Sequence, residues 1–273
     1  MTWSSPFTRH RTVKVGATET HVAELGEGVP VVLLHGNPDT HTVWATVAAR
    51  LQGMRVIAPD LPGFGKSTAP DDFELSLDAQ AEWVRELLTA LEFDRVHLVI
   101  HDIGGVYGLA FATLHPQRLH TLTVMNTIFH PDYRWHFWGR MWRRRVIGNV
   151  VQAIANRPLF VRELRKGSPN MPREYADHAY DAFHASAKKM VLRYYRAADP
   201  EIWDGWDKRL LETTSTVPTQ ILWGDKDPFI QAHFADKLGG SVRHIEHGHW
   251  MMVEDPELVA GAINALVAAR PAR

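Results

Sequence analysis

The sequence contains no cysteine and no long hydrophobic run, and its charges nearly cancel. The absence of cysteine excludes disulfides, thiolate metal sites and a cysteine nucleophile. No window approaches the roughly 20 apolar residues that a membrane span needs, and residues 1–16 lack an apolar stretch of signal-peptide length. The net charge of −1 predicts no long-range attraction to nucleic acid or to an anionic membrane surface. We therefore expect a cytoplasmic protein that acts on a small neutral molecule.

The chain is long enough for one large α/β domain that carries an insertion, with 273 residues of which 45% are hydrophobic. The pattern predicts strands at 11–15, 19–25, 29–34, 55–58, 96–100, 122–125, 217–223 and 242–245, and helices at 43–51, 76–91, 106–114 and 256–267. This alternation predicts an α/β fold with a mostly parallel central sheet flanked by helices. Residues 129–214 show only helical patterns, rich in Trp, Tyr, Arg and His. We interpret them as an inserted helical cap between two core segments, 1–128 and 215–273.

A carboxylate stands in the tightest predicted turn of the chain. Asp102 follows the apolar run Leu98-Val99-Ile100, and Gly104 and Gly105 lead into the next helix. A tight strand-to-helix turn of this kind presents one side chain and is the nucleophile elbow that usually carries serine. A carboxylate there attacks carbon and leaves an alkyl ester on the protein, which suits epoxides and carbon–halogen bonds better than carboxylic esters. The alternative is an ordinary turn, in which Asp accepts backbone hydrogen bonds.

Two later loops carry the groups that such a nucleophile needs. Asp225 and Asp227 follow the penultimate strand, and His249 follows the last one. Loops at the carboxyl ends of parallel strands converge, and an imidazole near neutrality is suited to remove a proton from water. The aspartate loop alone is equally typical of a solvated turn. His244 and His247 lie close to His249 in sequence, but no further ligand motif accompanies them, so we expect no metal and no cofactor.

These residues resemble the α/β-hydrolases, specifically the branch with an aspartate nucleophile that includes epoxide hydrolases, haloalkane dehalogenases and fluoroacetate dehalogenases. The likeness spans essentially the whole chain, through the order of nucleophile, acid and histidine, through His35-Gly36-Asn37-Pro38 and through Gly248-His249-Trp250. It implies that Asp102 is the nucleophile, His249 the base that activates water, and Asp227 the acid that orients the histidine. Where some relatives carry the acid instead, this chain has Asn126, which favours Asp227.

The resemblance also implies an oxyanion hole made by the main-chain N–H groups of Asn37 and Ile103. On the substrate class, the motifs of the different branches of this family disagree. Haloalkane dehalogenases share Asn37, which would bind the halide, but normally place Trp after the nucleophile, where this chain has Ile103. Fluoroacetate dehalogenases carry arginines just after the nucleophile, which are absent here, so a carboxylate substrate is disfavoured.

The cap segments 133–137 and 194–196 resemble those of epoxide hydrolases, in which a Tyr pair, or a His and a Tyr, bonds the epoxide oxygen. We expect His136 and Tyr195 in this role, with Tyr133 as the substitute; packing within the cap is the alternative for each. The sequence thus predicts an epoxide hydrolase that gives a vicinal diol. A haloalkane dehalogenase is the alternative, and a silent hydrolase-fold binding protein a third interpretation.

The partners that we expect are a small neutral organic substrate and water, with no nucleic acid and no membrane. The oligomeric state stays open, a homodimer included. The basic run Arg143-Arg144-Arg145 is interpreted as a solvated helix face.

Overall fold

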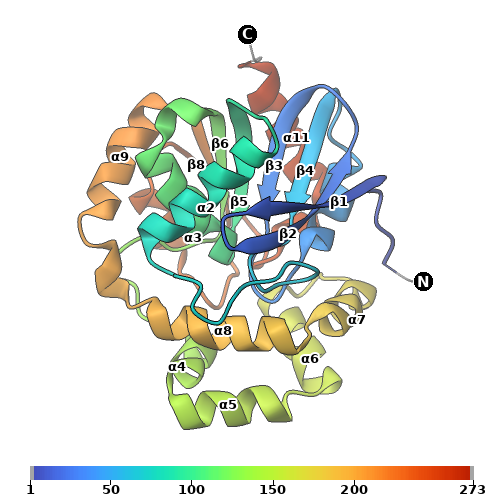
Figure 1. Cartoon of the computed structure of the whole chain (residues 1–273), viewed down its shortest axis with the longest axis vertical. Helices are drawn as coiled ribbons and strands as arrows, with labels where there is room; N and C mark the ends of the chain where they lie inside the picture. The colour runs from blue at the N-terminus through green and yellow to red at the C-terminus, as the bar shows by residue number, and fades with distance from the viewer. Residues whose placement is uncertain (1–2, 271–273) are drawn as a thin grey trace.

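The computed structural model describes residues 3–270 and contains one eight-stranded sheet in the order β1-β2-β4-β3-β5-β6-β7-β8 (Figure 1). β1 and β2 pair antiparallel with each other, β2 pairs antiparallel with β4, and the remaining strands are parallel. The strands are β1 (Arg9–Val15), β2 (Thr18–Leu25), β3 (Val29–Leu34), β4 (Met54–Pro59), β5 (Val96–His101), β6 (Leu119–Met125), β7 (Thr219–Gly224) and β8 (Ser241–Ile245). Each predicted strand is present, within a few residues of its expected ends.

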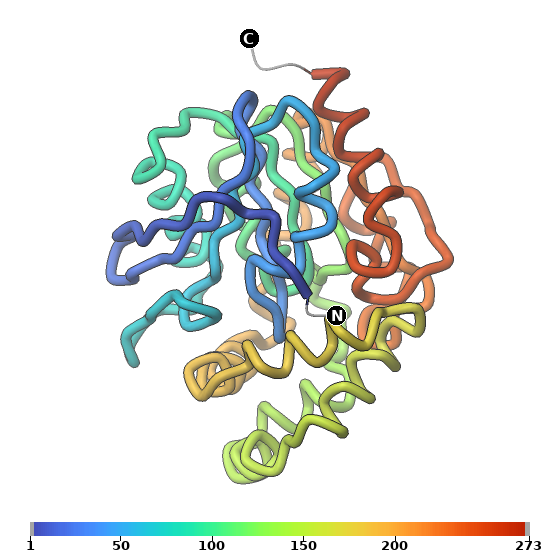
Figure 2. Tube along the Cα trace, turned by 90° about the vertical axis from the view of Figure 1, so that its right-hand side faces the viewer, coloured from blue at the N-terminus to red at the C-terminus, as the bar shows by residue number. Residues whose placement is uncertain are grey.

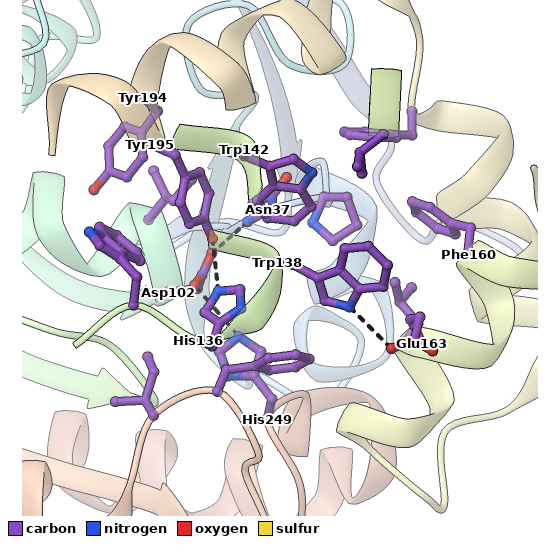
Figure 3. A pocket seen from close by; sticks show the side chains of 18 of the residues that line it. Asn37, Asp102, His136, Trp138, Trp142, Phe160, Glu163, Tyr194, Tyr195 and His249 are labelled. Atoms are coloured by element: carbon purple, nitrogen blue, oxygen red, sulfur yellow. Dashed lines mark hydrogen bonds and ion pairs between the residues drawn. The ribbon is translucent and has the colours of Figure 1, made fainter. Parts of the chain in front are cut away.

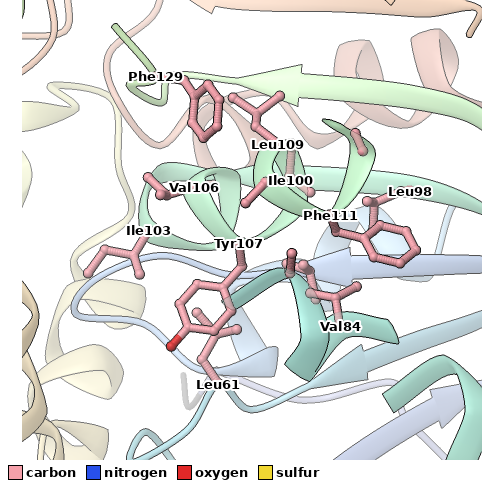
Figure 4. Packing of buried hydrophobic residues seen from close by; sticks show 14 of the residues in the cluster. Leu61, Val84, Leu98, Ile100, Ile103, Val106, Tyr107, Leu109, Phe111 and Phe129 are labelled. Carbon is pink, nitrogen blue, oxygen red and sulfur yellow. The ribbon is translucent and has the colours of Figure 1, made fainter. Parts of the chain in front are cut away.

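Helices cover both faces of the sheet. α2 (Leu77–Ala90), α3 (Asp102–Leu114) and α9 (Trp206–Thr216) pack together on one face, and α1 (Ala45–Ala48), α10 (Met251–Glu254) and α11 (Pro256–Ala268) on the other. Every residue of β5 is buried, as expected for a central strand covered on both sides. Figure 4 shows the packing of α3, in which Tyr107 and Phe111 lie near Val84 of α2. This packing holds the start of α3, and with it the elbow, in a fixed position.

Two predicted helices differ from the observed ones. The segment expected as a helix over 43–51 forms a 3-10 turn (His41–Trp44) followed by the short α1, because its β-branched residues Thr42, Val43, Thr46 and Val47 weaken helix formation. α3 begins at Asp102 instead of 106. α2 begins as expected, with the Ser76 hydroxyl oxygen accepting the backbone N–H of Ala79 at 3.2 Å.

The cap helices lie beyond the carboxyl ends of the parallel strands, as Figures 1 and 2 show from two directions. They are α4 (Phe137–Arg143), α5 (Arg145–Ile154), α6 (Arg157–Gly167), α7 (Arg173–Ala182) and α8 (Ala185–Ala197). α9 falls inside the expected cap segment 129–214 but packs against α3 beside the sheet. Within residues 3–270, no helix has the length and apolar character needed to cross a membrane.

Candidate active site

The elbow between β5 and α3 holds Asp102 in an unusual backbone conformation. Its φ is 49°, in the left-handed region that costs free energy for a residue with a side chain. The neighbouring chain passes very close, because a Cβ added to Gly36 would lie 2.4 Å from the Cβ of Asp102. A Cβ added to Gly104 would lie 2.3 Å from the carbonyl oxygen of His35. Glycine at both positions is therefore a steric requirement of the turn.

Backbone donors hold one oxygen of the Asp102 carboxylate. The N–H of Asn37 donates to Oδ1 at 2.7 Å. Burial raises the pKa of Asp102 above its ordinary value, against the opposing effects of His249 and of the N–H groups of Asn37 and Ile103. The main-chain N–H groups of the two residues expected to form the oxyanion hole thus both contact the Asp102 carboxylate. Oδ2, the other oxygen, faces His249.

His249 lies between two carboxylates. Its Nδ1–H donates to Oδ2 of Asp227 at 2.6 Å, and its Nε2 lies 3.6 Å from Oδ2 of Asp102. Burial opposes a charge on this imidazole, but the nearby carboxylates, Asp227 first, outweigh burial and raise its pKa. Because Nδ1 carries the proton shared with Asp227, the neutral ring has its lone pair on Nε2, toward Asp102.

The structure distinguishes the two aspartates of the preceding loop. Asp227 is buried and accepts backbone N–H groups from Phe229 at 2.7 Å and Ile230 at 3.1 Å. Asp225 is exposed and pairs instead with His244 at 2.6 Å. Of these two loop aspartates, Asp227 is therefore the one that contacts His249.

Asn126 has a positioning role that the sequence did not reveal. Its Nδ2 donates to Oδ2 of Asp227 at 2.8 Å, and its Oδ1 accepts the N–H of Gly224 at 2.9 Å. The amide cannot supply a charge, but it fixes the carboxylate that does. The only signal for this role in the sequence is an asparagine at the end of a central strand, which by itself indicates no more than the absence of a second acid there.

The cap contributes a polar pair that faces Asp102. Nε2 of His136 lies 3.4 Å from the hydroxyl of Tyr195, and Figure 3 shows both side chains pointing toward Asp102. Nδ1 of His136 accepts the N–H of Gly139 at 3.3 Å, which places the proton on Nε2. Burial lowers the pKa of His136 to about 4, so the ring is a neutral donor at neutral pH. Burial and the charge of Asp102 raise the pKa of Tyr195, so its hydroxyl stays protonated.

Tyr133, the expected substitute, also lines the cavity, but its hydroxyl donates to the carbonyl oxygen of Phe229 at 3.1 Å. The hydroxyl of Tyr133 is therefore already engaged within the protein, whereas a donor to the substrate has to be free to bind it.

These groups surround a cavity of about 120 Å³ between the cap and the sheet (Figure 3). Its wall is mostly apolar and includes the aromatic side chains of Trp135, Trp138, Trp142, Phe160, Phe183 and Phe229. Asn37, His136, Tyr195 and His249 gather around Asp102, and Glu163 lies apart from them beside Trp138. An apolar wall with a few polar groups is the arrangement of a site that orients an apolar ligand. The indole N–H of Trp138 donates to Glu163 at 3.1 Å across this wall, a contact between α4 and α6 that no sequence pattern indicated.

A separate buried cluster joins His21, His41 and Asp60, whose potential ligand atoms lie within 4.8 Å of one another. Both oxygens of Asp60 are fully used by hydrogen bonds. Oδ1 accepts Nδ1–H and the backbone N–H of His41, both at 2.8 Å, and Oδ2 accepts Nδ1–H of His21 and the N–H of Lys66. Hydrogen bonding alone therefore accounts for this cluster. His244, His247 and His249 do not converge: His247 lies nearest Asp255, and the other two bind different aspartates.

The family model described as alpha/beta hydrolase fold matches residues 29–256. The chain belongs to the α/β-hydrolase family. A haloalkane dehalogenase from Mycobacterium bovis is 28% identical over 260 residues, which cover 89% of each chain. A 2-hydroxy-6-oxo-2,4-heptadienoate hydrolase from Pseudomonas putida is 39% identical, but only over 43% of this chain and 44% of that protein. The structure of the epoxide hydrolase CorEH superposes with a TM-score of 0.80, covers 96% of this chain and 99% of its own, and is 20% identical, which supports the fold alone. These similar proteins are hydrolases of different substrates, so the substrate of this hydrolase has to be argued from its own site.

Proposed function

We propose that this α/β-hydrolase is an epoxide hydrolase that acts through a covalent ester on Asp102. The observation that carries the proposal is the pair His136 and Tyr195, two neutral donors that face the nucleophile from the cap. Opening an epoxide breaks a carbon–oxygen bond and leaves a strongly basic alkoxide. That oxygen needs a hydrogen-bond donor while the bond breaks, and a proton afterwards.

In the first step the attacking oxygen of Asp102 is Oδ2, because Oδ1 is held by the N–H of Asn37. Oδ2 attacks the less hindered carbon of the epoxide. The carbon–oxygen bond of the epoxide breaks, and its electron pair stays on the departing oxygen. The hydroxyl of Tyr195, with Nε2–H of His136 beside it, stabilises this oxygen and supplies its proton. The product is a hydroxyalkyl ester of Asp102.

In the second step water attacks the ester carbonyl carbon, and Nε2 of His249 takes its proton. The oxyanion forms on Oδ1, where the N–H groups of Asn37 and Ile103 stabilise it. Collapse of this intermediate breaks the bond between the carbonyl carbon and Oδ2, and the proton on His249 passes to the alcohol that leaves. The released Asp102 carboxyl still carries one proton of the water, and this proton replaces the one that Tyr195 gave up, which restores both groups. The net change is addition of one water to the epoxide, which gives a vicinal diol.

A haloalkane dehalogenase is the second candidate, and one observation favours it. The indole Nε1–H of Trp142 is buried in the cavity wall without a hydrogen-bond partner in the described part of the chain, and such a donor suits a halide. Against this candidate, the residue after the nucleophile is Ile103, which has no side-chain N–H. The loss of one donor to developing charge costs about 3 kcal/mol elsewhere.

Peptide mass analysis of the His249→Gln variant separates the candidates. Without the base, the ester should accumulate on Asp102 during incubation with an epoxide or with a haloalkane of the same carbon skeleton. A mass increase equal to the intact epoxide supports the proposal, and an increase equal to the haloalkane minus its halide supports the second candidate. The Asp102→Asn/His249→Gln variant is the matched control and should show neither adduct. No adduct from either compound, with no turnover by the wild-type chain, would favour a silent binding protein.

A further inference from the structure

The outer surface of the cap carries an exposed apolar stripe. Six large hydrophobic side chains are exposed between residues 3 and 270, and four of them lie on α5. Their exposed fractions are 76% for Val146, 38% for Ile147, 52% for Val150 and 63% for Ile154. The spacing of 146, 150 and 154 places three of these side chains on one helix face. We call the four residues the α5 stripe. α5 is the helix farthest from the sheet in Figure 1.

Positive charge is concentrated around this stripe. Residues 129–167 contain nine arginines and lysines but only two acidic residues, although the whole chain has a net charge of −1. Arg140, Arg144 and Arg145 are exposed, and none of them pairs with a carboxylate in the described residues. Arg144 and Arg145 stand at the start of α5 itself. The balanced total charge, from which we expected no attraction to anionic surfaces, therefore conceals a strongly basic region of the cap.

We propose that the α5 stripe and its flanking arginines bind the surface of an anionic lipid bilayer. An amphipathic helix with an apolar face and basic neighbours is the arrangement that lies in a membrane interface, where apolar burial and attraction to anionic headgroups add. A second copy of the chain fits the same surface poorly. A two-fold interface centred on the stripe would bring two basic cap surfaces together, because residues 129–167 of each copy contain nine basic and only two acidic residues. Nucleic acid would leave the exposed valines and isoleucines without a partner.

An outer pocket in the same basic region of the cap lies beside the catalytic cavity. That pocket is lined by Phe137, Arg162 and Lys166, and it shares His136, Trp138, Glu163 and Phe229 with the cavity. Phe137, the first residue of α4, is 56% exposed. An apolar epoxide dissolved in lipid would thus reach Asp102 past the Trp138–Glu163 contact. This delivery step rests on the proposed function, whereas lipid binding does not.

Vesicle co-sedimentation of the full chain tests the proposal. We expect binding to phosphatidylglycerol vesicles, weak binding to phosphatidylcholine vesicles, and loss of binding in high salt. Since each basic residue near an anionic surface contributes about 1 kcal/mol, Arg144→Gln/Arg145→Gln should weaken binding roughly 30-fold. Val150→Gln/Ile154→Gln should also weaken it, whereas the control Leu211→Gln, which changes an exposed residue of α9 (46% exposed), should not.

Thermal unfolding and light scattering are measured on each variant, to show that it folds and to give its oligomeric state. Absence of binding to phosphatidylglycerol overturns the proposal, as does binding that the stripe and arginine variants leave unchanged. A dimer that the stripe variants convert to a monomer, without an effect on lipid binding, would assign the stripe to contact between copies. Turnover of a water-soluble epoxide without vesicles should be the same in all variants, so a failure of the proposed reaction is detected separately from a failure of lipid binding.

Discussion

Nε2 of His249 lies 3.6 Å from Oδ2 of Asp102, so this imidazole and this carboxylate share one electrostatic environment. The Asp102 carboxylate is one of the charges that raise the pKa of His249 in the free protein. In the proposed reaction, formation of the ester removes that charge. The pKa of His249 therefore falls at the stage when the ring has to be neutral to accept a proton from water, and the first step prepares the base for the second.

This coupling predicts two different pH dependences. Burial raises the pKa of Asp102 and attack requires the ionised carboxylate, so kcat/KM should fall as the pH falls through that raised pKa. When ester hydrolysis limits kcat, kcat should fall at low pH as His249 of the ester becomes protonated. Steady-state kinetics over a pH series, with ester accumulation followed by mass, tests both. A kcat/KM that stays constant down to the pH of acid unfolding would contradict the assignment of Asp102.

Asp227→Asn should stop turnover after the first step. The substitution keeps the shape of the side chain but removes the charge that holds the Nδ1 proton of His249. By analogy with the acid of serine protease triads, we expect kcat to fall on the order of 10³- to 10⁴-fold. The ester on Asp102 should then accumulate and be detectable by mass. Asp225→Asn is the matched control, because Asp225 contacts His244 on the surface; equal losses in both variants would refute the division between these two aspartates.

Removal of the cap donors should lower the rate of ester formation from epoxides much more than the rate from haloalkanes. Tyr195→Phe deletes the hydroxyl that faces the departing oxygen, and His136→Phe deletes the neighbouring Nε2–H. A lost general acid lowers the rate by about 10²-fold or more, so we expect a decrease of this size in the rate of ester formation from an epoxide. A haloalkane generates a halide that needs no proton, and its rate should change little. Equal effects on both compounds would indicate that these residues only shape the cavity.

The sequence was sufficient where function depends on local pattern. Buried strands, the glycines after Asp102 and the separate loops of Asp227 and His249 are all short-range signals, and the parallel sheet brings these loops together at one edge. Only the resemblance to epoxide hydrolases indicates the cap residues His136 and Tyr195, because nothing in their spacing of 59 residues predicts a contact.

Contacts between distant segments were not predictable in the same way. Asn126 supports Asp227 across 101 residues, and Trp138 meets Glu163 between two cap helices. Each depends on how whole elements pack, which hydrophobic periodicity does not specify. The charge of the chain shows the same limit, since a total near zero says nothing of the basic region around α5.

One such contact joins the cap to the core at the buried carboxyl of Asp39. The hydroxyl of Tyr175 on α7 donates to Oδ1 of Asp39, and the indole N–H of Trp250 donates to Oδ2 at 2.8 Å. Burial raises the pKa of Asp39 to about 7, with both donors opposing it. The native protein thus keeps a proton on Asp39 that the unfolded chain loses near pH 4. This group therefore lowers stability progressively as the pH rises from about 4 to about 7.

Tyr175→Phe should destabilise the protein more at high pH than at low pH. Above the pKa of Asp39 the lost hydrogen bond has a charged acceptor and is worth about 2 kcal/mol, whereas at about pH 5 the acceptor is neutral and the loss is about 1 kcal/mol. Urea unfolding at about pH 5 and at a pH above the pKa of Asp39 measures the difference in the free energy of unfolding. Tyr180→Phe, on the same helix, is the control, because the Tyr180 ring packs on Phe160 and Arg157 and its loss of a hydroxyl should change little at either pH. A penalty for Tyr175→Phe that does not grow with pH would mean that Asp39 is ionised, or neutral, throughout this range.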